Sequence, residues 1–103
     1  MTAKTLLTGL APVHPGEILR EDVLPALGKS KTEVARLLGT SRQSLYDLLA
    51  EKQGVTVAMA LRLGKLCGNG GGFWFALQTA YDMRKAEAEM AAELAKIPTL
   101  TAA

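Results

Sequence analysis

The chain has 103 residues, 49% of them apolar, and a formal net charge of +2, which suits one domain and is too short for two. One cysteine and one histidine exclude an internal disulfide and a Cys/His metal site. No apolar run approaches the roughly 20 residues that span a bilayer, and residues 1–15 make a poor signal peptide. We therefore expect a cytoplasmic protein without membrane, metal or cofactor.

The small net charge is unevenly distributed. Residues 29–65 carry seven basic side chains against three acidic ones, an excess of +4, whereas residues 1–28 and 66–103 each have a net charge of −1. A basic segment between acidic flanks is typical of a surface that binds a polyanion, although chance clustering on a solvated surface would look the same.

Strand signals are nearly absent and helix signals are dense, so we predict an all-α fold. The first predicted helix spans Pro15–Leu24, with its proline in the first turn, where a missing N–H leaves no bond unmade. Pro25 and then Gly28 should close it. We expect residues 1–12 to be flexible, residues 13–97 to form the domain and residues 98–103 to form a tail.

The second helix should begin after Ser30, because Glu33 completes a capping box with it, and should end at Gly39. The third should follow Thr40 or Ser41. Their inner faces would consist of Val34, Ala35, Leu37 and Leu38 in the second helix and Leu45, Leu48 and Leu49 in the third.

The fourth predicted helix follows Thr56 and ends at Gly68, and the fifth spans residues 72–97. The first turns of the fifth helix carry a cluster that we assign to the core or to a dimer interface: Phe73, Trp74, Leu77 and Tyr81. Farther along, apolar residues keep a heptad-like spacing that is broken by Glu87. This weak seam would pair with a second copy, pair with a partner protein, or lie in solvent.

Residues 31–50 match a helix-turn-helix pattern. Gly39-Thr40-Ser41 is too short a link for an antiparallel hairpin of helices, so the two helices must cross steeply. Counted from Lys31, the fifth residue lies at the crossing and is the small Ala35, and the ninth, which needs a left-handed backbone, is a glycine. The fourth, eighth, fifteenth and eighteenth residues are apolar, as packing requires.

If the leucines of the third helix point inward, its opposite face is polar. Arginine can bond guanine and glutamine can bond adenine in a DNA major groove, while hydroxyls, lysines and a helix N-terminus can bond phosphates. The predicted DNA-binding residues are Lys31, Thr32, Ser41, Arg42, Gln43, Ser44, Tyr46 and Lys52. Asp47 lies among them, where it would accept a bond from a cytosine amine or hold Arg42 or Arg36.

No set of residues indicates an enzyme. His14 precedes Pro15 at a helix start, which favours a capping or packing role, and Cys67 lies on an inner face as a structural thiol. The glycines at 68 and 70–72 lack the Gly-Lys-Ser/Thr of a phosphate-binding loop and indicate a linker.

Several blocks together resemble HigA-type (VapI-like) antitoxins of the Xre/Cro helix-turn-helix superfamily, over residues 13 to about 87. These blocks are His14-Pro15-Gly16-Glu17-Ile18-Leu19, Leu24-x-x-Leu27-Gly28, Ser41-Arg42-Gln43, Ala60-Leu61-Arg62-Leu63 and Phe73-Trp74-x-x-Leu77-Gln78-x-x-Tyr81-Asp82. The chain departs from the family's pattern at Ala50-Glu51, where Asn-Gly is usual, and at Gly70-Gly71-Gly72, where Ser-Pro-Glu is usual.

The resemblance implies a five-helix, lambda-repressor-like domain with an extended last helix. It also implies a homodimer that binds double-stranded operator DNA, represses its own operon, and neutralises a RelE-like (HigB-type) mRNA endonuclease toxin. Two alternatives stay open, namely a stand-alone repressor without a toxin and a protein-interaction antitoxin with little DNA binding.

Overall fold

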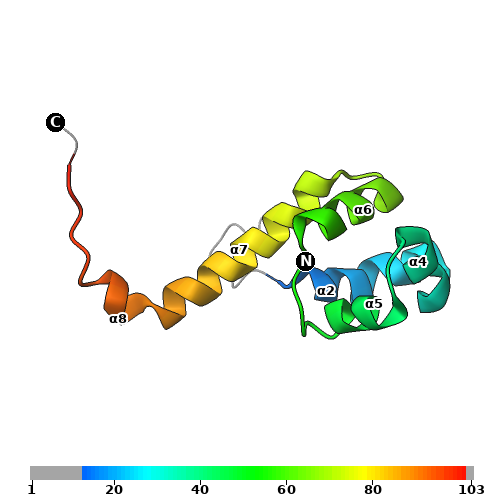
Figure 1. Ribbon diagram of the computed structural model, residues 1–103, viewed down its shortest axis with the longest axis horizontal. Coiled ribbons are helices and arrows are strands. Elements are labelled where there is room, and N and C mark those ends of the chain that lie inside the picture. The colour runs from blue at the N-terminus through cyan, green and yellow to red at the C-terminus, as the bar shows by residue number, and fades with distance from the viewer. Residues whose placement is uncertain (1–12, 102–103) are drawn as a thin grey trace.

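The computed structural model describes residues 13–101, and over this range the chain forms helices and no strands (Figure 1). The expectation of an all-α helix-turn-helix fold is confirmed. The helices are α2 (Pro15–Ile18), the π-helical turn η1 (Leu19–Val23), α3 (Leu24–Leu27), α4 (Lys31–Leu38), α5 (Arg42–Leu49), α6 (Val57–Cys67), α7 (Gly71–Glu89) and α8 (Ala91–Leu94). The flexible segment predicted at residues 1–12 lies outside the described residues.

The first helical stretch continues beyond its predicted end. α2, η1 and α3 follow one another without a break, and the stretch ends at Gly28, whose φ is 65°. The expectation that Pro25 closes this helix is therefore wrong, whereas Gly28 closes it as expected. In η1 the Leu24 N–H bonds to the Leu19 carbonyl, five residues back, so the backbone widens just before the proline. Pro25 then occupies the first turn of α3, where its ring and missing N–H are tolerated.

Local side-chain caps begin the next three helices. Ser30, Ser41 and Thr56 each accept a bond from the backbone N–H three residues later, at 3.1, 3.0 and 3.1 Å. Each cap satisfies a donor that the first turn of a helix leaves without a partner. Ser41, rather than Thr40, therefore begins α5, and the predicted starts of α4 and α6 are confirmed.

The core lies where α2, α4, α5, α6 and the first half of α7 meet. Leu45 and Leu48 of α5, Leu63 of α6 and Trp74 of α7 are at most 1% exposed. The Trp74 indole N–H donates to the Asn69 side-chain oxygen at 2.9 Å, so its polar atom is also satisfied. Because Trp74 presents no surface, it belongs to the core of one chain, the first of the two roles expected for it, and offers no area to a dimer interface.

The predicted inner face of α4 is correct except at one position. Val34, Ala35 and Leu38 are buried, but Leu37 is 43% exposed. It lies on the outer side of the helix and lines an open groove of about 550 Å³ with Leu61 and Lys65 of α6. Because Leu37 follows Val34 by three residues, the helical period alone would allow it to face the core; it is exposed because the helices that pack against α4 cover only the side that carries Val34, Ala35 and Leu38.

The pairing of α6 with α7 depends on a close approach of their backbones. A Cβ atom at Gly64 would lie 2.1 Å from the Gly71 backbone nitrogen, far inside contact distance. Gly71 and Gly72 form the first turn of α7, so the linker predicted from the glycines is shorter than expected. This contact sets the direction in which α7 leaves the rest of the domain.

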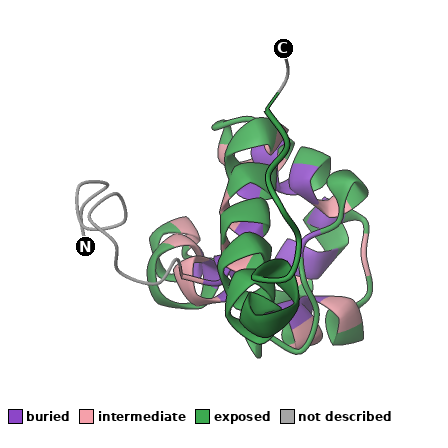
Figure 2. Cartoon of the chain, turned by 90° about the vertical axis from the view of Figure 1, so that its left-hand side faces the viewer, coloured by how far each residue is buried: buried purple, intermediate pink, exposed green. Residues whose placement is uncertain are grey.

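The second half of α7 projects from the globular part as an arm, which we define as residues 82–97 (Figures 1 and 2). Every residue of the arm is exposed, and the described chain measures 53 × 27 × 26 Å. The single helix predicted over residues 72–97 is wrong in one respect. It breaks at Met90, which leaves the helical region with φ −104° and ψ 9°, so the heptad-like spacing does not form one continuous seam.

Candidate nucleic-acid interface

Two arginines from outside the helix-turn-helix hold the C-terminal ends of its helices. Arg62 of α6 donates to the Leu38 carbonyl at the end of α4, at 2.7 Å. Arg20 of η1 donates to the Leu49 carbonyl at the end of α5, at 2.6 Å. Cations are favourable at helix C-termini, where the last carbonyls lack partners in the helix. Both contacts fix α4 and α5 from their inner side and leave their outer side clear.

The link between α4 and α5 has the predicted geometry. Gly39 has a φ of 72°, in the left-handed region that glycine adopts without strain. A Cβ atom at Gly39 would also lie 2.7 Å from the Arg62 guanidinium. The backbone conformation is therefore what favours glycine at the ninth position, and a larger residue there would also have to displace the end of the Arg62 side chain.

The outer face of α5 carries the residues predicted to read bases. Arg42 and Gln43 in its first turn are exposed, Tyr46 is 42% exposed, and Ser44 is half-buried. On the opposite side of the same helix, Leu45 is fully buried. α5 is thus a short amphipathic helix whose apolar side holds it to the core and whose polar side is open to solvent.

Most side chains of this face have partners within the face. The Ser41 hydroxyl donates to the Ser44 hydroxyl at 3.0 Å, and Gln43 Nε2 donates to Asp47 Oδ1 at 2.8 Å. Asp47 therefore holds Gln43, and the expectation that it holds Arg42 or Arg36 is wrong. Among the described residues, Arg42 shows no side-chain hydrogen bond or ion pair, so its five donors face solvent.

The predicted phosphate-binding residues flank α5 on both sides. Lys31 and Thr32 are exposed in the first turn of α4, and Lys52 is exposed in the loop that follows α5. The Lys31 ammonium lies 5.7 Å from the centre of the Tyr46 ring, a cation–π contact that joins the first turn of α4 to the face of α5.

Arg36 contributes less to the basic surface than its charge suggests. Its Nη2 donates to Glu33 Oε2 at 3.0 Å, and the guanidinium lowers the pKa of Glu33. The Glu33 carboxylate thus turns to Arg36 and not back to Ser30, so the predicted capping box forms only its Ser30 half. The basic side chains left near α5 are Lys31, Arg42 and Lys52.

The polar residues that connect the helix-turn-helix to the base of α7 were not predicted from the sequence. Gln78 is only 6% exposed; its Oε1 accepts from the Val55 N–H at 2.7 Å, and its Nε2 donates to Asp82 Oδ1 at 2.9 Å. The sequence feature that could have indicated Gln78 is the presence of a glutamine in an otherwise apolar stripe of α7. Gln53 adds a local bond from the loop to the Ser44 carbonyl, at 3.1 Å.

His14 has the capping and packing role that its position predicts. Its Nδ1 accepts from the Gly16 N–H at 2.9 Å, and its ring packs edge-on against Tyr81 of α7, with ring centres 4.9 Å apart. Burial lowers the pKa of His14, and Arg20 lowers it further, while Glu51 and Asp82 act in the opposite direction. Burial likewise raises the pKa of the half-buried Cys67 thiol.

Neither a metal site nor a membrane span is found within residues 13–101. No three His, Cys, Asp or Glu side chains of this range are grouped so that they could hold a metal ion. None of the helices in the same range is long and apolar enough to cross a membrane.

The fold and the open polar face of α5 define a helix-turn-helix protein of the type that carries an exposed recognition helix. No family model matches the chain. Virulence-associated protein I of Dichelobacter nodosus is 40% identical over 75 residues, which cover 73% of this chain and 69% of that protein.

Two solved antitoxin structures are also similar to the chain. Pseudomonas aeruginosa antitoxin HigA, solved with the higBA promoter, is 34% identical and superposes with a TM-score of 0.81 over 87% of this chain and 99% of that one. Antitoxin GraA in complex with its operator is 40% identical, with a TM-score of 0.82 over 92% of this chain and 97% of that one. The chain belongs to the HigA family of helix-turn-helix antitoxins, as its motifs indicated.

Proposed function

We propose that the chain is the antitoxin of a type II toxin–antitoxin pair and that it represses its own operon by binding operator DNA through α5. The observation that carries the proposal is the exposed face of α5, where Arg42 and Gln43 lie in the first turn of a helix anchored by buried leucines. The solved HigA with its promoter and GraA with its operator, both similar to this chain over most of its length, support the same role.

In this role α5 enters the major groove. Arg42 donates to a guanine and Gln43 pairs with an adenine, while Ser41, Ser44 and Tyr46 contact phosphates or thymine methyl groups. Lys31 and Thr32 at the start of α4, and Lys52 after α5, contact the DNA backbone on either side.

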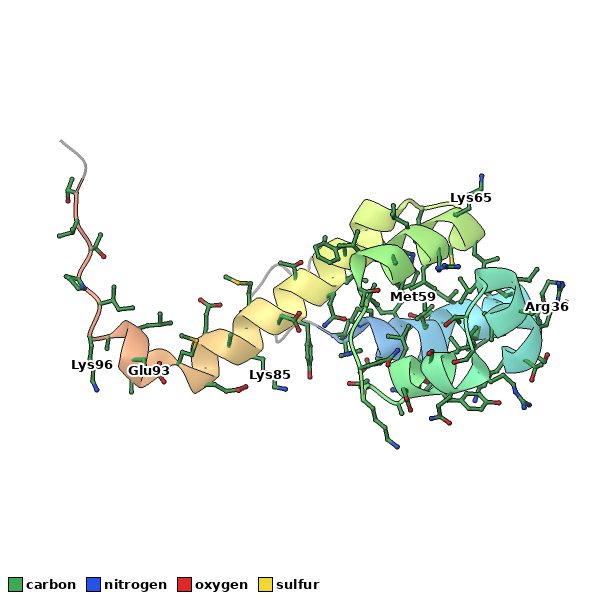
Figure 3. The ribbon with its side chains drawn as sticks, in the orientation of Figure 1. Arg36, Met59, Lys65, Lys85, Glu93 and Lys96 are labelled. Carbon is green, nitrogen blue, oxygen red and sulfur yellow. The ribbon has the colours of Figure 1, made fainter. Side chains whose placement is uncertain are left out.

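The base-reading role is tested with the double variant Arg42→Ala/Gln43→Ala. Its affinity for the DNA upstream of the chain's own coding sequence should fall to that for unrelated DNA, because two bidentate base contacts of about 1–3 kcal/mol each are lost. Lys85→Ala on the arm removes a positive charge far from α5 and is the matched control (Figure 3). Unchanged preference for the upstream DNA in the double variant, with its helicity intact, rules out α5 as the reader.

Phosphate contacts are tested through the salt dependence of binding. Lys52→Ala should weaken binding to all sequences alike and reduce the slope of log K against log salt concentration by about 1. Lys85→Ala should leave the slope unchanged. Binding that is absent at low salt in the wild-type chain would favour the alternative of a protein-interaction antitoxin with little DNA binding.

A homodimer would double the short site that one α5 reads. Phe73 is 45% exposed, and Leu77 and Tyr81 are half-buried, so these three remain candidates for the interface without Trp74. An apolar hollow of about 200 Å³ also lies between α6 and α7, on a different side of α7 from these three residues. It is lined in part by Val57 and Phe75, which are 59% and 42% exposed.

We place the dimer contact on this α6–α7 surface and test it by charge. Leu61, which is 63% exposed, also lines the hollow, and Leu61→Glu should yield monomers in sedimentation equilibrium and weaken operator binding. Met83→Glu places the same charge on an arm residue that is 57% exposed, and it should leave the dimer intact. The opposite pattern, with only Met83→Glu giving monomers, would move the interface to the arm.

The toxin partner is a RelE-like, HigB-type mRNA endonuclease. If a neighbouring reading frame encodes such a protein, the two should co-purify, and the antitoxin should abolish ribosome-dependent mRNA cleavage at equimolar ratio. Operator binding without any such neighbour or partner would favour the stand-alone repressor.

A further inference from the structure

The Gln43–Asp47 pair lies in the middle of the exposed face of α5. We propose that Asp47 is a positioning residue that commits Gln43 to adenine, a role that rests on the proposed DNA-binding function. Asp47 acts through the amide of Gln43 and makes no contact with a base itself.

The hydrogen bond fixes the orientation of the Gln43 amide. Gln43 Nε2 donates to Asp47 Oδ1 at 2.8 Å across one turn of α5, where residues four apart lie side by side. An ionised carboxylate only accepts hydrogen bonds, so the amide nitrogen must face Asp47 and the amide oxygen must face away from it. A glutamine without this partner would rotate between both orientations and would lose that freedom on binding.

The fixed amide suits one purine. One hydrogen of Nε2 is engaged by Asp47, which leaves one N–H donor and the Oε1 acceptor for a base edge. Adenine offers N7 as an acceptor and its N6 amine as a donor, which match this pair. Guanine offers two acceptors, N7 and O6, and would require both hydrogens of Nε2. Asp47 therefore favours adenine and opposes guanine at the position that Gln43 reads.

The arginines nearest in sequence do not compete for Asp47. Arg36 is paired with Glu33, and Arg42 shows no ion pair among the described residues. Asp47 thus brings an uncompensated negative charge to a face that would meet phosphates. Its charge should lower the affinity for every DNA sequence, while its hydrogen bond sharpens the choice of base.

The test selects DNA from a random-sequence duplex library with wild-type protein and with Gln43→Ala, Asp47→Ala and Asp47→Asn. Gln43→Ala should lose adenine preference at one position of each half-site, a preference of about 5- to 150-fold for a bidentate contact. Asp47→Ala should lose it at the same position and keep the others, and the double variant Gln43→Ala/Asp47→Ala should lose nothing more than Gln43→Ala does. Asp47→Asn offers a donor as well as an acceptor and no longer fixes the Gln43 amide, so it should lose much of the preference while binding all duplexes more tightly. Glu89→Ala on the arm is the control for the lost charge.

Three results would overturn the positioning role. Asp47→Ala could keep the adenine preference, it could flatten all positions equally, as a merely structural residue would, or Asp47→Asn could keep the preference in full although its amide can also donate. A wild-type protein that enriches no sequence is a different outcome, because it removes the DNA-reading function together with this role.

Discussion

Among the asparagine and glutamine side chains of the described residues, that of Gln78 should contribute most to the free energy of unfolding. The variant Gln78→Ala measures this contribution. The substitution leaves the Val55 N–H, now bonded at 2.7 Å, without its partner in a buried site. A buried donor without a partner costs about 1–3 kcal/mol. Loss of the bond to Asp82 and of the packed side chain raises the expected loss to about 2–4 kcal/mol.

The loss is large beside the total stability of a small domain, about 5–15 kcal/mol. Urea unfolding followed by circular dichroism should report it, and Tm should fall by about 4 °C per kcal/mol. Gln53→Ala is the matched control, because Gln53 donates to the Ser44 carbonyl at 3.1 Å from an exposed loop; its loss should stay below about 1 kcal/mol. Equal losses in the two variants would refute the reasoning that burial makes the Gln78 bonds valuable.

Three further predictions concern residues around the helix-turn-helix. Burial lowers the pKa of His14 below its ordinary value of 6.5 in the folded chain, so the unfolded chain binds the proton first and stability should fall as pH drops below about 6.5. His14→Asn, which keeps a capping oxygen, should flatten urea midpoints measured between pH 7.5 and 5.5; an unchanged slope would contradict this. Glu51 has a φ of 61°, so Glu51→Ala should be less stable than Glu51→Gly by about 1 kcal/mol in urea unfolding, and equal stability would mean that the conformation carries no strain. Arg62→Met, which removes the donor to the Leu38 carbonyl, should lower the thermal midpoint by several degrees, whereas Lys65→Met on the same helix should not; the reverse order would disprove the capping role.

At Ala50-Glu51 the chain departs from the family's pattern, and here a tertiary contact supports a turn that the local sequence does not favour. Asn-Gly would adopt the left-handed turn after α5 readily, whereas Glu51 adopts it with φ 61°. The Glu51 carboxylate accepts from the Arg20 guanidinium at 3.4 Å, and Arg20 also bonds the Leu49 carbonyl. A contact from a residue about thirty positions earlier thus helps to hold a turn that the local sequence disfavours.

The sequence by itself determined the features that depend on neighbours in the chain. The caps at Ser30 and Thr56, the left-handed Gly39 and the apolar stripe of α5 each involve groups within a few residues, whereas the choice of Ser41 over Thr40 came from the structure. Bonds over three or four residues form in the helix that the same residues build, so spacing alone predicts them. The family motifs and the polar residues on the outer face of α5 could be identified from the sequence for the same reason.

Only the tertiary structure decided the contacts between distant elements. It placed Trp74 wholly inside the core, turned Leu37 outward, and brought Arg62 and Gln78 to carbonyl and amide groups that lie more than 20 residues away. A side chain's burial depends on which helices meet over it, and this is set by their packing angles and not by periodicity. The sequence therefore determined which face of α5 could read DNA, and the packing of α2, α6 and α7 decided how firmly that face is held.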